Sequence, residues 1–275
     1  MSDKLIATDY NGTLDAARLE IGLGYLAVQD SLNRGDRWRA FDLFFKRQPK
    51  LYKILFSEKD NDLLETFSEV LEGEKTSELY ERSENFEDDL NNFGLRAFYK
   101  TLPGKFKEKI DGDFYEGSME TFEEASKHAK TMIYTHAIEE LIENKLEQYD
   151  VEDYFTEGVK GNHFATNENG EIVGVDWQVD EADTPRKKKK IGLIAEAGKL
   201  DIRPDEIVYV EDELNGVLYK LKEEGGLPII APSADEDVKK EAKKDDIFVP
   251  ESGGEEGWRE IRLGLGLEKS KYHSF

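Results

Sequence analysis

Cysteine is absent from this chain of 275 residues. Without a thiol there can be no disulfide framework, no thiolate nucleophile and no thiolate metal site. Histidine is also scarce, with four residues in the whole chain. A metal ion would therefore have to be held by oxygen atoms or by those four imidazoles.

Long apolar runs and net positive charge are missing as well. No stretch approaches the roughly 20 apolar residues of a membrane span, and no basic segment followed by an apolar region opens the chain. We therefore expect a cytoplasmic protein. The net charge of −23 repels nucleic acid and anionic membrane surfaces, so we expect neither as a partner. A phosphorylated substrate would be repelled too, unless a metal ion or a lysine reverses the field locally.

The segment Lys4–Leu14, KLIATDYNGTL, is the most informative in the chain. Its apolar run leads directly to Asp9 and then to Gly12, the pattern of a short buried strand that delivers a carboxylate into a tight turn. An ordinary strand that ends in an Asn-Gly turn is the alternative. The hydrophobic content of 38% supports a globular core around this strand, in one large or two modest domains.

Helical patterns dominate the sequence from Asp15 to about Ile110. Apolar residues recur there at the spacing of amphipathic helices, so the aromatic residues among them are better explained by packing than by a cofactor site. Pro103 and Gly104 interrupt the pattern near its end, and Phe114–Ser118 is typical of a loop. We predict an all-helical insert.

A second polar strand end follows the insert. Met119–Ala129 is predicted to be a helix, and Thr131–Tyr134 a short strand that ends at Thr135, with another helix directly after it. A hydroxyl group beside a helix N-terminus can bind phosphate, because the first turn has unpaired N–H groups and a positive dipole end. Simple helix capping by Thr135 is the alternative.

The third segment, Ile207–Val217, has the sequence IVYVEDELNGV. Its β-prone residues predict a buried strand, which ends at Glu211 and Asp212. Two adjacent acids in this position are costly unless a cation neutralises them, so the segment predicts a magnesium site. Strand-end acids without a metal are the alternative.

The remaining segments complete an α/β pattern. Asn162–Val175 is typical of a hairpin with its turn at Asn169 and Gly170, and we interpret His163 within it as structural or surface-exposed. Thr184–Lys190, TPRKKKK, opens a helix as a largely solvated basic run. Strands are then predicted at Leu227–Ala231 and Ile247–Val249 and a helix at Glu255–Leu265, an alternation that favours a parallel sheet with crossover helices.

Taken in order, these segments resemble the motifs of the haloacid dehalogenase (HAD) superfamily of hydrolases. Asp9 stands at the nucleophile position of the first motif, DxDGTL, and Asn11 stands where that motif has its second Asp. Thr135 is similar to the second motif, and Glu211 with Asp212 to the fourth. The hairpin and the lysine spacing are similar to the phosphoserine phosphatase-like and phosphoglucomutase-like branch.

The resemblance implies an α/β fold with a Rossmann-like parallel sheet core and an inserted all-α cap. The core would comprise residues 1–15 and 119–275, and the cap residues 16–118. In the family this helical cap closes over the site and supplies substrate contacts.

The resemblance also implies a magnesium-dependent phosphomonoester hydrolase that acts on a small phosphorylated metabolite. Asp9 would attack phosphorus, and water would hydrolyse the resulting aspartyl-phosphate. Thr135, His136 and Lys189 would bind the phosphoryl group, with Lys187, Lys188 and Lys190 open as alternatives to Lys189. Magnesium would be held by three carboxylates and one backbone carbonyl, namely by Asp9, Glu211, Asp212 and Asn11.

Asn11 leaves the type of reaction open, because an amide cannot carry the proton that the family's second Asp transfers. The outcomes are a phosphatase for good leaving groups, a phosphotransferase or dehalogenase-like enzyme, or a protein that only binds. We expect the phosphatase, since the other motifs are present. The residues do not name the substrate, and both a monomer and a homodimer fit them.

Overall fold

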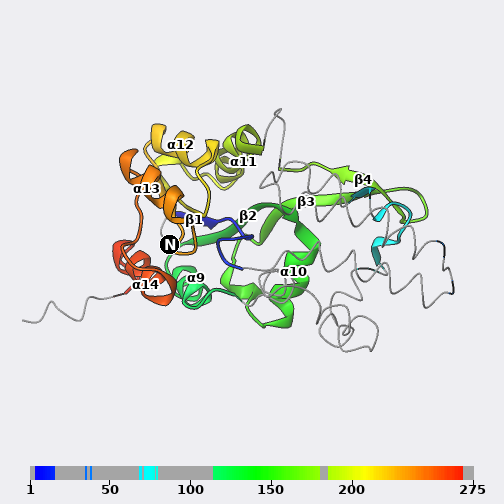
Figure 1. Ribbon diagram of the computed structural model, residues 1–275, viewed down its shortest axis with the longest axis horizontal. Coiled ribbons are helices and arrows are strands. Elements are labelled where there is room, and N and C mark those ends of the chain that lie inside the picture. Colours follow the sequence, from blue (N-terminus) through cyan, green and yellow to red (C-terminus); the bar gives the residue numbers. More distant parts are fainter. Residues whose placement is uncertain are drawn as a thin grey trace, which may run out of the picture.

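The structure is a computed structural model that describes residues 4–15, 35, 38, 68–69, 71–77, 79, 114–179 and 185–268, with the backbone alone at 185–191. The helical insert predicted for residues 16–118 lies almost entirely outside these residues. The described residues form an α/β core around one sheet, which Figure 1 shows with its flanking helices.

The sheet has six strands in the order β4-β3-β2-β1-β5-β6, with β1 near its centre. Neighbouring strands are parallel except for the antiparallel pair of β3 and β4. This confirms the predicted parallel sheet and the predicted hairpin. The strand bounds are Leu5–Thr8 (β1), Lys130–Ile138 (β2), Val159–Thr166 (β3), Ile172–Asp176 (β4), Ile207–Glu211 (β5) and Leu227–Ile230 (β6).

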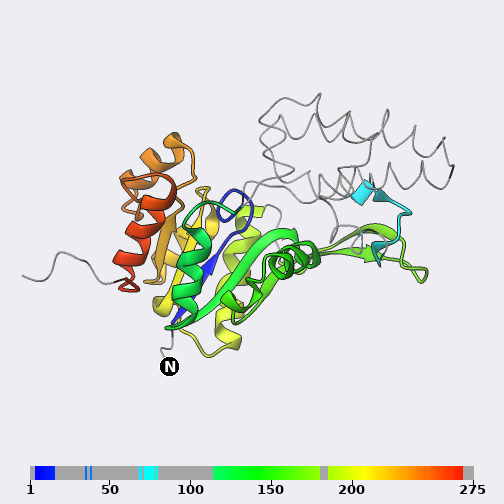
Figure 2. The ribbon, with the colours of Figure 1, turned by 90° about the horizontal axis from the view of Figure 1, so that it is seen from below.

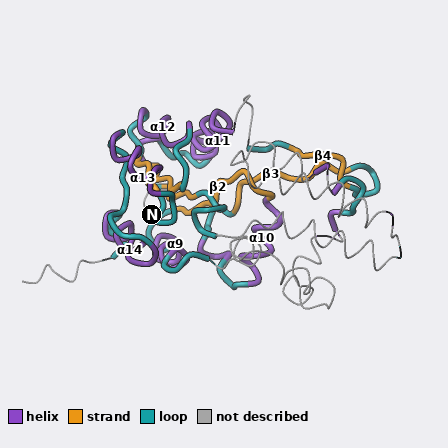
Figure 3. The backbone as a smooth tube through the Cα atoms, viewed as in Figure 1, coloured by secondary structure: helices purple, strands orange, loops and turns teal. Residues whose placement is uncertain are grey.

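Helices cover both faces of the sheet. The helix bounds are Ser118–Ser126 (α9), Glu139–Gln148 (α10), Pro185–Lys199 (α11), Gly216–Glu223 (α12), Glu236–Lys244 (α13) and Gly254–Gly264 (α14), with 3-10 turns at Glu152–Tyr154 (η3) and Pro204–Glu206 (η4). Residues of α11, α12 and α13 share one buried cluster with the sheet, and residues of α9, α10 and α14 share the other. Figure 3 shows the strands between these two groups of helices.

The alternating direction of side chains along the central strands explains why there is one buried hydrophobic cluster on each face of the sheet. In β1, Leu5 and Ala7 belong to one cluster and Ile6 to the other, and in β5 Tyr209 and Val210 divide in the same way. Successive side chains of a strand point to opposite faces, so strands buried on both faces are apolar throughout. The apolar runs of the sequence therefore became the centre of the sheet.

The hairpin of β3 and β4 extends the sheet away from the core (Figure 2). Its turn contacts the described segment 71–77, where Lys75 forms an antiparallel bridge with Glu171 and the N–H of Gly73 donates to the carbonyl of Ile172 at 2.9 Å. Part of the predicted insert is therefore held to the core by backbone hydrogen bonds.

Two local predictions were wrong. The strand predicted to end at Thr135 continues as β2 to Ile138, and α10 begins only at Glu139. The reason is an irregular pairing with β3 between Tyr134 and Ile138, a bulge that keeps the chain extended. The strand predicted at Ile247–Val249 is reduced to an isolated bridge between Ile229 and Phe248.

Among the helices that the structure describes, we find none long and apolar enough to cross a membrane.

Candidate active site

Asp9 lies directly after β1, at the carboxyl edge of the sheet. Its N–H donates a hydrogen bond of 2.9 Å to the carbonyl of Val210, and its side chain is 6% exposed. Thr8 is paired with Val210 on β5, so Asp9 and Glu211 follow at the same level on neighbouring strands. Parallel strands bring their carboxyl ends together, and this register places two acids side by side.

Asp9, Glu211 and Asp212 form one acidic cluster. Each offers a carboxylate oxygen, and these oxygens all lie within 4.8 Å of one another. Among the described residues, these three carboxylates lie close enough together to bind one metal ion. The structure thus brings together the three carboxylates that the sequence predicted as ligands.

The electrostatics of this cluster suit a cation. Burial raises the pKa of Asp212 well above its usual value, and the charges of Glu211 and Asp9 raise it further. Such a set of carboxylates repels itself until positive charge is supplied, and oxygen ligands are those that Mg²⁺ prefers. The residues present therefore fit a magnesium ion.

Gly12 and Thr13 shape the turn on which Asp212 rests. Gly12 has φ +81°, and a Cβ atom there would lie 2.2 Å from Oδ2 of Asp212. The hydroxyl of Thr13 donates to Oδ1 of the same carboxylate at 3.1 Å. Glycine is required at position 12 for its conformation and for the close approach of Asp212.

Glu211 is held by donors from two directions. The side-chain amide of Asn215 donates to Oε2 of Glu211 at 2.5 Å, and the hydroxyl of Tyr209 donates to the same oxygen at 3.1 Å. Asn215 also caps α12, because its Oδ1 accepts from the N–H groups of Val217 and Leu218. Burial raises the pKa of Tyr209 well above its usual value, and the charge of Glu211 adds to the shift, so this phenol remains a donor.

Asn11 is partly buried in the turn after Asp9. Its Oδ1 atom is buried and has no hydrogen-bond partner within the described part of the chain. An amide can accept or donate a hydrogen bond, but it cannot deliver a proton as a carboxylic acid does. Asn11, which stands where the resembled motif has its second Asp, therefore removes a possible proton donor two positions after Asp9.

Thr135 and His136 lie within β2, in the irregular stretch between its paired residues Tyr134 and Ile138. Because Thr8 is paired with Ile133, both follow at the same edge of the sheet as Asp9. The hydroxyl oxygen of Thr135 accepts from the N–H of Ala137 at 3.2 Å, and the carbonyl of His136 accepts from the side chain of Asn162 at 2.8 Å. Thr135 is buried and His136 half-buried. The capping role considered for Thr135 is wrong, since the N-cap of α10 is Ile138.

Comparison with solved structures identifies the fold. A substrate-bound phosphoserine phosphatase matches with a TM-score of 0.56 and 14% identity, over 97% of this chain and 98% of the other. A phospho-aspartyl intermediate analogue of phosphoserine phosphatase matches with a TM-score of 0.55 and 15% identity, over 98% and 100%. A HAD family hydrolase from Salmonella enterica serovar Typhi matches with a TM-score of 0.52 and 14% identity, over 98% and 73%. The chain has the HAD fold. No protein-family model and no curated protein sequence matches it.

The HAD fold accounts for the position of the acids at the carboxyl edge of the sheet, but not for their supporting contacts. Sequence reasoning missed Tyr209, Thr13 and Ser233 as residues of this site. Tyr209 gave a signal, because it lies two positions before Glu211 and so on the same face of β5. Ser233 gave none, since its hydroxyl reaches the carbonyl of Gly12 across 221 positions of sequence.

Proposed function

We propose that the protein is a magnesium-dependent phosphomonoester hydrolase that forms an aspartyl-phosphate on Asp9. The observation that carries this proposal is the cluster of Asp9 and Glu211, both buried, with the partly buried Asp212 at the carboxyl edge of a HAD-type sheet. All three carboxylates would bind the ion, and that of Asp9 would also be the nucleophile. The substrate would be a small phosphorylated metabolite.

In this mechanism a carboxylate oxygen of Asp9 attacks phosphorus as the bond to the leaving oxygen breaks. Water then attacks the aspartyl-phosphate and releases inorganic phosphate. Magnesium held by the carboxylates of Asp9, Glu211 and Asp212 and by the backbone carbonyl of Asn11 would neutralise phosphoryl charge. Asn11 cannot protonate the leaving oxygen, which must take its proton from water or from another group.

Thr135, His136 and Lys189 are proposed to bind the phosphoryl oxygens. The position of Lys189 is supported by the register of α11, whose buried residues include Leu193 and Ala197. Residues four apart lie on one face of a helix. Position 189 therefore lies on the sheet side, whereas position 187, about 160° away around the helix, lies on the side of exposed Gly198.

The same helix is held close to β2 by a glycine. A Cβ atom on Gly192 would lie 1.7 Å from the hydroxyl oxygen of Tyr134. Because Tyr134 directly precedes Thr135, this contact places α11 next to the end of β2 that is proposed to bind phosphate. The register thus favours Lys189 among the lysines that the sequence left open.

Residues 16–118 are proposed to form the cap that closes over this site. The acidic, cysteine-free composition remains consistent with a cytoplasmic monomer or homodimer that does not bind nucleic acid. These points stay predictions.

Asn11 supports a second candidate, a HAD-fold protein with altered chemistry or with binding alone. Its buried Oδ1 has no hydrogen-bond partner within the described residues. A donor group of a bound ligand would satisfy this atom.

Hydrolysis of an aryl phosphate with and without magnesium tests the proposal, with Asp9→Asn as the control. Magnesium-dependent turnover that disappears in the control is the expected result. Magnesium binding without any turnover of aryl or alkyl phosphates would favour the binding protein.

A further inference from the structure

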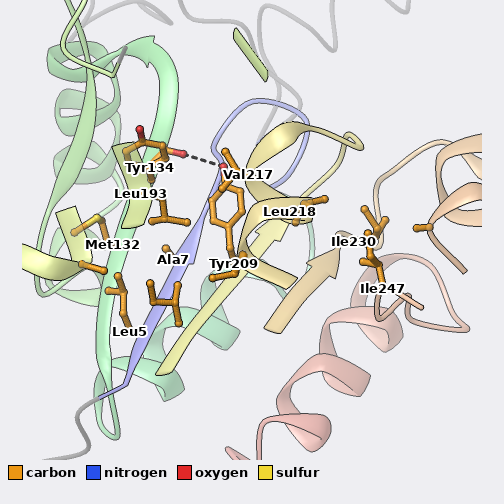
Figure 4. Close-up of a cluster of buried hydrophobic side chains, with 14 of the residues drawn as sticks. Leu5, Ala7, Met132, Tyr134, Leu193, Tyr209, Val217, Leu218, Ile230 and Ile247 are labelled. Atoms are coloured by element: carbon orange, nitrogen blue, oxygen red, sulfur yellow. Dashed lines mark hydrogen bonds between the residues drawn. The ribbon is translucent and has the colours of Figure 1, made fainter. Parts of the chain in front are cut away.

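The contact from which we draw a further inference connects β5 with β2 across the central strand β1. The phenol oxygen of Tyr209, on β5, lies 3.1 Å from Oε2 of Glu211 and 3.2 Å from the carbonyl oxygen of Tyr134 on β2. Since β1 lies between β2 and β5, the side chain of Tyr209 reaches across the strand that leads to Asp9. Figure 4 shows the ring of Tyr209 beside Ala7, with the dashed hydrogen bond to Tyr134.

We propose that Tyr209 is a positioning residue that orients Glu211 for the metal ion and ties this carboxylate to the phosphate-binding end of β2. The proposal rests on the metal site of the proposed function. Tyr209 itself contacts neither the substrate nor the ion and acts through Glu211.

The donor arrangement around Glu211 supports this role. Oε2 accepts two hydrogen bonds, from Tyr209 and from Asn215, while Oε1 accepts one from the N–H of Asp212 at 3.2 Å. A carboxylate anchored through one oxygen presents the other in a fixed direction, which is how supporting hydrogen bonds tune metal sites. Asn215 is itself held as the N-cap of α12, so both anchors of Oε2 belong to rigid elements.

The second acceptor of Tyr209 extends the effect to β2. The carbonyl of Tyr134 precedes Thr135, and it lies where the regular pairing of β2 with β3 ends. A strand that leaves its ladder at this point needs another contact to fix its backbone. The shared proton of Tyr209 supplies that contact and sets the separation between the metal side and the phosphate side of the site.

Replacement of the hydroxyl alone tests the inference, and Tyr10→Phe is a matched control. Tyr10 is also fully buried, and its hydroxyl donates to a buried carboxylate, Oδ2 of Asp15, at 2.8 Å. Both Tyr209→Phe and Tyr10→Phe therefore lose one tyrosine-to-carboxylate hydrogen bond, but only the first loses it at the acidic cluster. Magnesium affinity is measured by isothermal titration calorimetry without substrate, so the result does not depend on phosphatase activity.

We expect Tyr209→Phe to weaken magnesium binding by about tenfold, the lower end of the usual effect of supporting residues, and Tyr10→Phe to leave it within about twofold of wild type. Unchanged affinity in Tyr209→Phe, or an equal loss in both variants, overturns the inference. A wild-type protein that binds no magnesium also overturns it. Magnesium binding with the expected loss in Tyr209→Phe, but no phosphatase turnover in wild type, refutes the proposed function and leaves the inference supported.

A double variant covers the case in which Tyr209→Phe does not fold because Glu211 has lost one of its three donors within the described residues. Tyr209→Phe with Glu211→Gln removes the buried charge together with its donor. If Tyr209 acts through Glu211, the double variant binds magnesium as tightly as Glu211→Gln alone. A further loss in the double variant shows that the phenol acts elsewhere and overturns the inference.

Discussion

The hydroxyl of Ser233 donates a hydrogen bond of 2.6 Å to the carbonyl oxygen of Gly12. Gly12 also lies against the carboxylate of Asp212, so loops that follow β1, β5 and β6 meet at one residue. The acids are therefore carried on turns that are braced by neighbouring strands. A site that needs carboxylates at fixed separations depends on such bracing.

Asp9→Asn is expected to abolish turnover and to leave the fold intact. The nucleophile must be a carboxylate, and loss of a nucleophile costs many orders of magnitude in rate, at least about 10⁴-fold. The protein should keep its circular dichroism spectrum, because the change removes one negative charge from a cluster that repels itself. Turnover close to wild type would exclude Asp9 as the nucleophile.

Magnesium binding and the substitution Asp212→Asn should both stabilise the protein, because each relieves the repulsion among the three carboxylates. The pKa of Asp212 is raised by burial and then by the charges of Glu211 and Asp9. The metal-free folded state therefore holds this proton more tightly than the unfolded chain, and stability present at acid pH is lost as the pH rises through the folded pKa.

At neutral pH, Asp212→Asn should raise the melting temperature of the metal-free protein, by about 2 °C or more for each kcal/mol of repulsion relieved. Wild type should gain about 2.7 kcal/mol at a magnesium concentration of 100 times Kd, and the variant should gain little. Differential scanning calorimetry in EDTA and in magnesium measures both effects. An equal magnesium response in the two proteins would count against the metal site.

Asn11→Asp should change alkyl phosphate hydrolysis more than aryl phosphate hydrolysis. An alkyl leaving group needs a proton that Asn11 cannot give, and general acid catalysis is worth about 10² to 10⁴ in rate. The measurement is kcat/KM for both substrates in wild type and variant at saturating magnesium. Equal effects on the two substrates would show that another group already supplies the proton.

Lys189→Ala is expected to lower kcat/KM by about 10²-fold, as removal of one charge-stabilising donor usually does. Lys187→Ala is the control with the same loss of charge on the opposite side of α11, and it should stay within about twofold of wild type. Steady-state kinetics on an aryl phosphate tests both variants. If Lys187→Ala causes the larger loss, the register argument for Lys189 fails.

His163→Gln should reduce stability at acid pH only. Burial lowers the pKa of His163, but the hydrogen bond and charge of Glu140, 2.6 Å from Nδ1, outweigh it and leave the pKa raised. The stabilisation is therefore present below the unfolded pKa of about 6.5 and is lost as the pH rises through the folded pKa.

Because the pair is partly exposed, the effect should be at most about 1 kcal/mol. Urea unfolding at about pH 5.5 and pH 9 gives the free energy of unfolding of wild type and His163→Gln with position 163 of wild type charged and neutral, respectively. A difference that is larger at the higher pH would contradict the assignment of a charged His163 to this contact.

The local patterns of the sequence determined a large part of this structure. The apolar run before Asp9 and the one before Glu211 predicted buried strands that end in acids, because strand burial depends on residues that are neighbours in the chain. Asn169 and Gly170 located the hairpin turn for the same reason. The acidic cluster followed, since parallel strands share one carboxyl edge.

Tertiary structure alone decided how the site is supported. The bulge that carries β2 past Thr135 arises from pairing with β3, and the bond from Ser233 to Gly12 joins segments far apart in the chain. A buried ion pair of 2.5 Å between Lys145 and Asp15 likewise spans 130 positions. Such contacts depend on the order and register of strands, which no local pattern of residues encodes.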